Sequence, residues 1–185
     1  MFLLRHGQSA FNQHFAQSGR DPGIIDAPLT PRGLEQAEGA AKHFLNLKTR
    51  PQRQAPPSRI LCSPYTRALQ TATPIARALG LPLKVSPFLG ERRLYSCDIG
   101  TKLARLKAAW PGVDFSPVEK DDWWPPREES QEDIERRVQA FLALEDGAEE
   151  TLIVSHWYFI FTLSGIDCEN CDIVWRDGQG KFHRQ

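Results

Sequence analysis

Apolar and polar positions alternate along the chain in blocks that predict strands and helices in turn. Short apolar runs predict buried strands at Met1–Leu4, Arg59–Cys62, Leu83–Val85 and Thr151–Val154. Between these runs, longer segments place apolar residues three and four positions apart, which is the spacing of a helix with one buried face. This alternation predicts a single α/β domain with three layers, in which a mostly parallel open sheet is flanked by helices on both faces.

Capping residues indicate where three helices begin. Thr30–Pro31 and Ser63–Pro64 each place a hydroxyl before a proline that suits the first turn of a helix. Ser130–Asp133 has the spacing of a capping box. The expected buried faces are Leu34, Ala37, Ala41, Phe44 and Leu45 in the first helix, Leu69, Ala72, Ala76 and Leu79 in the second, and Ile134, Val138, Phe141 and Leu142 in the third.

Breaker residues separate these elements. The second helix is predicted to run to Leu79, to kink at Pro74 and to end at Gly80. Residues 13–29 contain several glycines and prolines and are predicted to form a long surface loop, and residues 48–57 are predicted to form a polar linker.

Residues 86–129, called the cover segment below, are predicted to be irregular apart from one helix at 101–110. A loop of this length is usually functional or disordered, and its tryptophans argue against disorder. We expect the cover segment to be inserted in one domain spanning residues 1–185 and to lie over one end of the sheet. The chain then ends in a predicted hairpin with strands at Cys171–Arg176 and Lys181–His183.

The charge balance argues against two classes of main partner. The 185 residues include 23 basic and 23 acidic side chains, whereas nucleic acid or an anionic membrane would favour a basic excess. The apolar runs are too short to span a bilayer, and the first strand begins at Met1, which leaves no space before it for a signal peptide. We therefore expect a cytoplasmic protein, whose oligomeric state the sequence leaves open.

Cys168 and Cys171 have the spacing of a metal or redox motif. A zinc site needs four ligands, usually from two such pairs. Cys62 and Cys97 lie in unrelated contexts, and His183 is a lone candidate. We therefore predict reduced thiols and no metal site.

Polar residues able to bind an anion follow three of the predicted strands. Arg5-His6-Gly7 ends the first strand, Arg67 lies one turn into the helix after the second, and Ser155-His156 follows the fourth. If these strands are parallel neighbours, their carboxyl ends meet at the sheet edge where open α/β sheets bind ligands. Two guanidiniums, two imidazoles and two helix N-termini at one edge favour a dianion such as a phosphoryl group.

Five motifs occur in an order that matches a known family. They are Arg5-His6-Gly7-Gln8-Ser9 with Asn12, Pro28-Leu29-Thr30 with Gly33, Gln36 and Ala37, the segment from Ser63 to Ala72, Glu129-Ser130 with Asp133 and Arg137, and Val154-Ser155-His156. With these motifs the chain resembles the histidine phosphatase superfamily, which includes the cofactor-dependent phosphoglycerate mutases. The motifs span most of the chain, so together they are more specific than any one of them.

The resemblance implies a two-step phosphoryl transfer. His6 would attack phosphorus and form a phosphohistidine. Arg5, Arg67 and His156 would hold the three equatorial oxygens and offset the charge that develops in the transition state. Asn12 would add a neutral donor. Because arginines supply the positive charge, the implied reaction needs neither a metal nor another cofactor.

The resemblance also implies a carboxylic acid that protonates the leaving oxygen and then helps to activate water. The candidate is Glu91, which follows the third strand at the start of the cover segment, where the family keeps its acid. Asp98 is the alternative.

Three functions remain open. The leading expectation is a metal-independent phosphomonoester phosphatase acting on a small phosphorylated metabolite. A phosphoglycerate mutase would share the pocket, but mutases of the family are longer and usually carry Glu-Arg-His-Tyr-Gly where this chain reads Glu91-Arg92-Arg93-Leu94-Tyr95. The third is a catalytically silent phosphate-binding protein, because Trp157 follows His156 where the family usually has glycine.

Overall fold

The computed structural model describes residues 1–49, 55–144 and 150–185, and its strands form one sheet. The strands are β1 (Phe2–Arg5), β2 (Arg59–Cys62), β3 (Leu83–Val85), β4 (Val113–Asp114), β5 (Thr151–Ser155), β6 (Ile173–Arg176) and β7 (Phe182–Arg184). Within the described residues their order is β4-β3-β2-β5-β1-β6-β7. The first five strands in this order are parallel, whereas β6 is antiparallel to both of its neighbours. The predicted mostly parallel sheet is confirmed.

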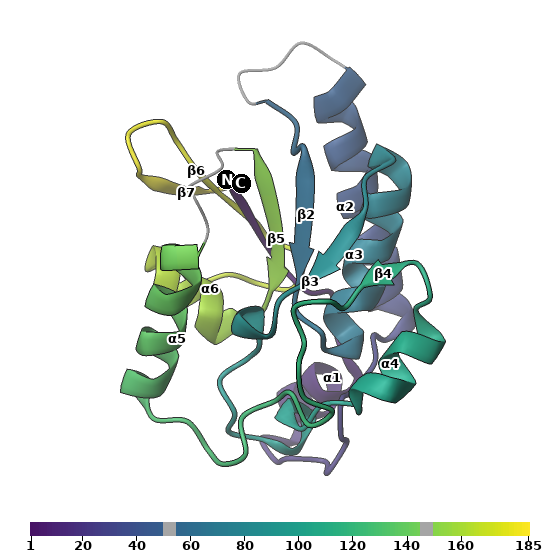
Figure 1. Cartoon of the computed structure of the whole chain (residues 1–185), viewed down its shortest axis with the longest axis vertical. Helices are drawn as coiled ribbons and strands as arrows, with labels where there is room; N and C mark the ends of the chain where they lie inside the picture. Colours follow the sequence, from purple (N-terminus) through teal and green to yellow (C-terminus); the bar gives the residue numbers. More distant parts are fainter. Residues whose placement is uncertain (50–54, 145–149) are drawn as a thin grey trace.

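Helices cover both faces of the sheet (Figure 1). They are α1 (Ala10–Ser18), α2 (Pro31–Thr49), α3 (Thr66–Leu79), α4 (Leu103–Ala109), α5 (Gln131–Leu144) and α6 (Trp157–Ser164), with the 3₁₀ turns η1 (Pro87–Leu89) and η2 (Ser96–Asp98). Helices α2, α3 and α4 lie on one side, and α5 and α6 lie on the other. The carboxyl ends of β2 and β5 face α1 and the cover segment, at the bottom of Figure 1. The three-layer α/β architecture is confirmed.

The central strands are apolar on both faces because each face packs against helices. In β1, Phe2 and Leu4 belong to the core beneath α2 and α3, whereas Leu3 belongs to the core beneath α5 and α6. Successive side chains of a strand point to opposite faces of the sheet, so consecutive apolar residues of β1 enter two separate cores. This explains why Phe2, Leu3 and Leu4 form an uninterrupted apolar run in β1.

Most helix boundaries follow the predicted capping signals. The backbone N–H of Gly33 donates to Thr30 Oγ1 at 3.1 Å at the start of α2. Ser130 and Asp133 exchange hydrogen bonds before α5, as a capping box requires. Gly80 ends α3 in the left-handed conformation, with φ of 68°.

The predicted cap at Ser63 is wrong. Helix α3 begins three residues later, and it continues past Pro74 to Leu79. The first helical N–H, that of Thr66, donates to Asp26 Oδ1 at 2.9 Å. The Ser63 hydroxyl instead contacts the ring of His156. The carboxylate of Asp26, which is distant in sequence, therefore caps this helix. The local sequence pattern does not reveal this cap.

The predicted surface loop at 13–29 is also wrong in its first part, because α1 extends to Ser18. Ser9 and Asn12 form a capping box at its start, and Gly19 ends it with φ of 65°. The buried side chain of this helix is Phe11. Its apolar periodicity is too weak to predict a helix, although both end signals are present in the sequence.

The apolar face of α2 is rotated slightly from the prediction. Leu34 and Leu45 are 46% and 38% exposed, whereas Ala40 and Leu47 are buried. The first two residues of the predicted linker 48–57 belong to α2, and residues 50–54 lie outside the described part of the chain.

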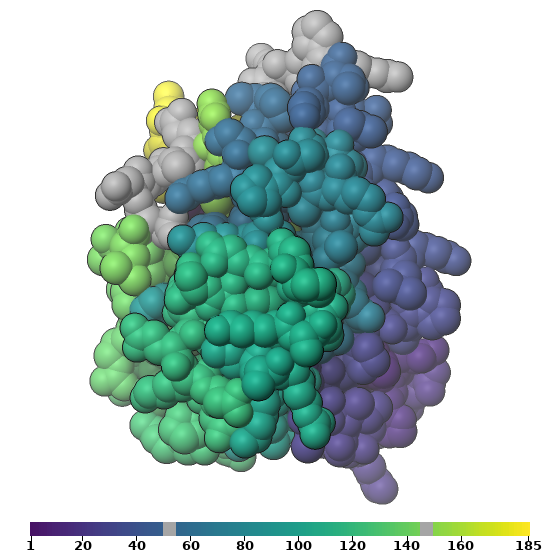
Figure 2. Space-filling model, turned by 45° about the vertical axis from the view of Figure 1, so that its right-hand side comes forward, coloured from purple at the N-terminus to yellow at the C-terminus, as the bar shows by residue number. Residues whose placement is uncertain are grey.

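The cover segment contains the predicted helix, α4, and adds the short edge strand β4. Its green residues spread over the lower part of the visible face in Figure 2. The predicted terminal hairpin is confirmed as the antiparallel pair β6 and β7. No helix among the described residues is long and apolar enough to cross a membrane.

Candidate active site

The carboxyl ends of β1, β2 and β5 meet at one edge of the sheet, as the sequence predicts. Arg5 is paired with Ser155 across β1 and β5, and Cys62 is paired with Val154 across β2 and β5. The backbone N–H of His6 donates to the carbonyl of Ser155 at 3.0 Å. The residues that follow these strands therefore come within reach of one another.

A cavity of about 220 Å³ lies at this edge. Five of the six predicted site residues line it, namely Arg5, His6, Asn12, Arg67 and Glu91. The sixth, His156, is fully buried beside His6, and the centroids of the two rings are 5.0 Å apart.

The ring of His6 is held so that one nitrogen stays available. Its Nδ1 lies 2.7 Å from the carbonyl oxygen of Gly7, so Nδ1 carries the proton and Nε2 keeps its lone pair. Burial lowers the pKa of His6 well below 6.5, and the charges of Arg67 and Arg5 lower it further. His6 is therefore neutral at pH 7, which is the form that can act as a nucleophile.

Two glycines bring the loop after His6 directly onto α2. A Cβ on Gly7 would meet the carbonyl of Gly33, and a Cβ on Gly33 would meet the backbone of Gln8. The backbone N–H of Gly7 also donates to Thr71 Oγ1 at 3.0 Å. This close backbone contact fixes the position of His6 relative to α2 and α3.

His156 is held by the hydroxyl of Ser63. Its Nε2 lies 2.8 Å from Ser63 Oγ, and its Nδ1 is buried with no hydrogen-bond partner in the described residues. Burial, followed by the charge of Arg67, lowers the pKa of His156 well below 6.5. If Nε2 accepts the hydroxyl proton, the neutral ring carries its own proton on Nδ1, the nitrogen without a partner.

The buried guanidinium of Arg67 is held on several sides. Its Nη1 donates to the carbonyl of Cys97 at 2.7 Å, and its Nη2 donates to Asp98 Oδ1 at 3.2 Å. Its face lies 4.5 Å from the ring centroid of Tyr65. Arg5 is held more loosely, because Nη1 donates to the carbonyl of Cys168 at 2.7 Å while the buried Nε has no partner in the part of the chain described.

The two candidate acids, Glu91 and Asp98, differ in their surroundings. Glu91 Oε1 accepts from the backbone N–H groups of Arg92 at 2.9 Å and Tyr158 at 3.1 Å. Burial, reinforced by the nearby charge of Asp98, raises the pKa of Glu91 to about 7. Glu91 can therefore hold or release a proton near neutral pH.

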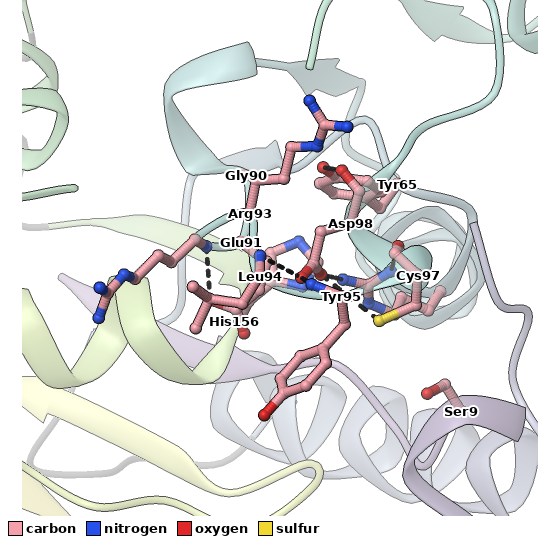
Figure 3. Close-up of polar contacts among 12 residues, drawn as sticks. Ser9, Tyr65, Gly90, Glu91, Arg93, Leu94, Tyr95, Cys97, Asp98 and His156 are labelled. Atoms are coloured by element: carbon pink, nitrogen blue, oxygen red, sulfur yellow. Dashed lines mark hydrogen bonds and ion pairs between the residues drawn. The ribbon is translucent and has the colours of Figure 1, made fainter. Parts of the chain in front are cut away.

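Asp98 has both carboxylate oxygens engaged (Figure 3). Its Oδ1 pairs with Arg67, and its Oδ2 accepts from the backbone N–H groups of Leu94 and Tyr95 at 3.1 and 3.0 Å. Its side chain is 2% exposed. Asp98 thus holds the guanidinium of Arg67 and also fixes the backbone at Leu94 and Tyr95.

Arg137 and Glu129 hold the backbone on either side of Glu91. Arg137 Nη1 donates to the carbonyls of Phe88 at 2.9 Å and Gly90 at 2.7 Å, and Nη2 donates to that of Glu91 at 3.1 Å. The same guanidinium forms two hydrogen bonds with the Glu129 carboxylate, at 3.1 and 2.8 Å. Both residues belong to a motif of the sequence, but spacing alone gave them no role.

Asn12 faces the cavity from the first turn of α1. Its Oδ1 accepts from Ser9 N at 3.1 Å, Ser9 Oγ at 3.0 Å and Asn170 Nδ2 at 3.2 Å. The amide Nδ2 makes no hydrogen bond among the described residues, so its two protons are available to a ligand.

Three of the four cysteines are buried, and Cys171 is half-buried. All four are free thiols, and the described residues contain no cluster of three or more His, Cys, Asp or Glu side chains that could hold a metal ion. Burial raises the pKa of Cys168 to about 11 and that of Cys171 to about 12. Both thiols therefore stay protonated at neutral pH.

The sequence of the chain matches a known family. Residues 1–165 match the histidine phosphatase superfamily (branch 1), and the chain belongs to this family. Over 168 residues it is 30% identical to the adenosylcobalamin/alpha-ribazole phosphatase of Salmonella typhimurium, covering 84% of this chain and 73% of that protein. Over 212 residues it is 28% identical to a phosphoglycerate mutase-like protein of Arabidopsis thaliana, covering 92% and 75%.

A solved structure supports the same fold. The ecdysone phosphate phosphatase of Bombix mori, in complex with tungstate, superposes with a TM-score of 0.67 over 100% of this chain and 90% of its own. The two sequences are 16% identical, so the likeness concerns the fold alone.

Proposed function

We propose that this protein is a metal-independent phosphomonoester phosphatase that acts through a phosphohistidine on a small phosphorylated metabolite. The observation that carries the proposal is a pair of buried nitrogens, Arg5 Nε and His156 Nδ1, which have no hydrogen-bond partner among the described residues. Buried polar atoms without partners are costly, and both belong to side chains grouped around the neutral ring of His6. A phosphoryl group has the charge and the acceptor oxygens that these atoms and Arg67 require.

In the first step, His6 Nε2 attacks phosphorus while the bond between phosphorus and the ester oxygen breaks. Arg5, Arg67 and His156 offset the charge on the equatorial oxygens. Glu91 transfers its proton to the departing oxygen, so the alcohol leaves neutral. The raised pKa of Glu91 supports this role, and the engaged oxygens of Asp98 argue against it as the acid.

In the second step, a water oxygen attacks the phosphorus bound to His6, and the bond between phosphorus and Nε2 breaks. The Glu91 carboxylate accepts the proton from this water. Inorganic phosphate leaves, His6 returns to its neutral form, and Glu91 is again protonated. Asn12 Nδ2 supports one phosphoryl oxygen throughout.

We further propose that the cover segment sets the substrate range within a single domain. It supplies Glu91, Arg92, Tyr95, Cys97 and Asp98 to the cavity lining. Loops carried on a rigid sheet commonly hold specificity in this way.

The test is phosphate release from p-nitrophenyl phosphate and a panel of sugar, nucleotide, amino-acid and glycerate phosphates, with EDTA present. His6→Ala should abolish turnover, whereas His14→Ala, which changes an exposed histidine of α1, should not. A labelled protein adduct that survives base and is lost in acid would support the phosphohistidine. Turnover by His6→Ala at the wild-type rate would refute the nucleophile.

The same experiment separates the two alternatives. Interconversion of 2- and 3-phosphoglycerate, dependent on a bisphosphoglycerate primer, would indicate a mutase. Phosphate binding by folded wild-type protein with no turnover of any ester would indicate a silent binding protein.

A further inference from the structure

Beyond the phosphate-binding groups, the cavity is walled by aromatic side chains. The five aromatic residues in its lining are Phe11, Phe15, Tyr95, Trp157 and Tyr158. They come from three separate parts of the chain, namely α1, the cover segment and the start of α6. Tyr95 is 39% exposed although its ring belongs to an aromatic cluster, and an exposed apolar surface at a cavity commonly marks a binding site.

One wall is a cluster of three rings. Phe11 and Phe15 are stacked with centroids 5.4 Å apart, and Tyr95 lies 5.3 Å from each of them. Figure 3 shows the Tyr95 ring extending away from the polar contacts of Asp98. The backbone N–H of Tyr95 is fixed by Asp98 Oδ2, so this ring is positioned by the loop that also anchors Arg67.

The second wall is formed by Trp157 and Tyr158, and contacts with neighbouring residues fix the Trp157 ring. The Trp157 indole stacks on Phe161, with an interplanar angle of 5° and centroids 5.2 Å apart. Its Nε1 donates to Asp167 Oδ1 at 2.7 Å, and Tyr158 packs against it at 4.6 Å. Rings fixed in this way lose little entropy when a ligand binds.

The cavity offers little to a negatively charged substrate tail. Arg92 is the lining arginine outside the phosphate-binding pair, but its Nε donates to the carbonyl of Glu129 at 2.9 Å and its Nη1 to Gln131 Oε1 at 3.3 Å. Its guanidinium lies 5.0 Å from the ring centroid of Tyr158. These two neutral acceptors hold Arg92 against the cavity wall, so an anionic tail could pair with it fully only by displacing these hydrogen bonds.

We infer that the leaving group is an uncharged alcohol carrying a flat apolar ring, which packs among Tyr95, Trp157 and their aromatic neighbours while the phosphate lies at His6. This inference rests on the proposed function and narrows its substrate class. A carboxylate-bearing ester would place its charge beside apolar rings, where desolvation opposes it.

The test compares 2-phenylethyl phosphate with propyl phosphate, whose leaving alcohols have comparable acidity, and with phosphoserine, which carries a carboxylate. We expect kcat/KM to be about tenfold higher for the phenylethyl ester than for the propyl ester. This ratio corresponds to about 1.4 kcal/mol, which lies within the range for aromatic contacts. Phosphoserine should be the poorest substrate. Tyr95→Ala and Trp157→Ala should each reduce the phenylethyl-to-propyl ratio, and Tyr95→Phe should retain it.

Trp110→Ala is the matched control, because Trp110 is a half-buried aromatic residue that does not line this cavity. This variant should keep the wild-type ratio. Equal activity on the two alkyl esters, or a preference for phosphoserine, would overturn the inference while leaving the phosphatase intact.

A binding measurement separates this inference from the proposed function. Calorimetry with 2-phenylethylphosphonate and propylphosphonate needs no turnover and can use the His6→Ala variant. About tenfold tighter binding of the phenylethyl compound, weakened in the double variant with Tyr95→Ala, supports the aromatic wall even if no ester is hydrolysed. Equal binding of the two phosphonates refutes it.

Discussion

Arg137 Nη2 donates a hydrogen bond to the backbone carbonyl of Glu91 over 3.1 Å, from a helix that lies 46 residues further along the chain. The Glu129 carboxylate holds the same guanidinium in place, and Glu129 Oε2 also accepts from the backbone N–H of Arg93 at 3.0 Å. The loop that carries Glu91 is therefore fixed by a charged pair that does not line the cavity. Arg137 is a positioning residue for the proposed acid.

Arg137→Lys should weaken this positioning, because an ammonium group cannot reproduce the planar set of donors. We expect kcat for alkyl phosphates to fall about tenfold or more, with a smaller loss for p-nitrophenyl phosphate, whose leaving group needs little protonation. Steady-state kinetics on both substrates measure this difference. Arg136→Lys, at an exposed neighbour on α5 that pairs with Asp133, is the control and should leave both activities unchanged. Equal losses on both substrates would mean that Arg137 has a structural role only.

The pKa of Glu91, raised to about 7, predicts a pH dependence. The protonated form is the acid, so kcat for alkyl phosphates should fall as pH rises through about 7. Glu91→Gln should lower kcat for alkyl phosphates about 100-fold or more and remove this dependence. Glu128→Gln, at an exposed position, should retain the wild-type profile. A wild-type profile in Glu91→Gln would point to Asp98 or another acid.

The same pKa affects stability. Because the pKa of Glu91 in the folded chain lies above its ordinary value of 4.5, the folded state binds the proton more tightly than the unfolded state does. Its contribution to stability therefore declines as pH rises from about 4.5 through 7. The Glu91→Gln variant should not show this decline in stability. The difference in melting temperature, variant minus wild type, should therefore increase from pH 5 to pH 8. A constant difference in melting temperature would contradict the raised pKa.

The sequence predicted the parts of this site that lie beside strand ends. Arg5 ends β1, and His6 and His156 directly follow β1 and β5, so the parallel order of the sheet is sufficient to bring them together. The sequence could not show that Asp98 anchors Arg67, or that Asp26 caps α3, because these contacts join segments 31 and 40 residues apart through loops without periodicity. The helix α1 was missed for a different reason, since its end signals are local but its apolar face is weak.

The lowered pKa values of His6 and His156 predict that the protein loses stability in acid. Their pKa values are lowered well below 6.5 by burial and by neighbouring arginines, so the unfolded chain binds these protons more readily than the folded chain does. Stability should therefore fall as pH drops below about 6.5. Melting temperatures of wild type and His6→Asn between pH 7.5 and pH 5 measure this effect, which should be smaller in the variant. His14→Asn is the control, and its melting temperature should fall between pH 7.5 and pH 5 as much as that of the wild type.

Gly33 and Gly39 lie on the same helix, α2, and predict opposite effects of one substitution. A Cβ on Gly33 would overlap the backbone of Gln8, whereas a Cβ on Gly39 meets nothing within 4 Å. Gly33→Ala should destabilise the protein by about 1–3 kcal/mol, the cost of forcing extra volume into a packed contact. It should also lower activity, because the shifted backbone carries His6. Gly39→Ala should stabilise by about 0.5–1 kcal/mol, because alanine restricts the unfolded chain and favours helix. Urea unfolding of both variants measures the two free energies, and a neutral or stabilising Gly33→Ala would show that the loop after β1 does not depend on this backbone contact.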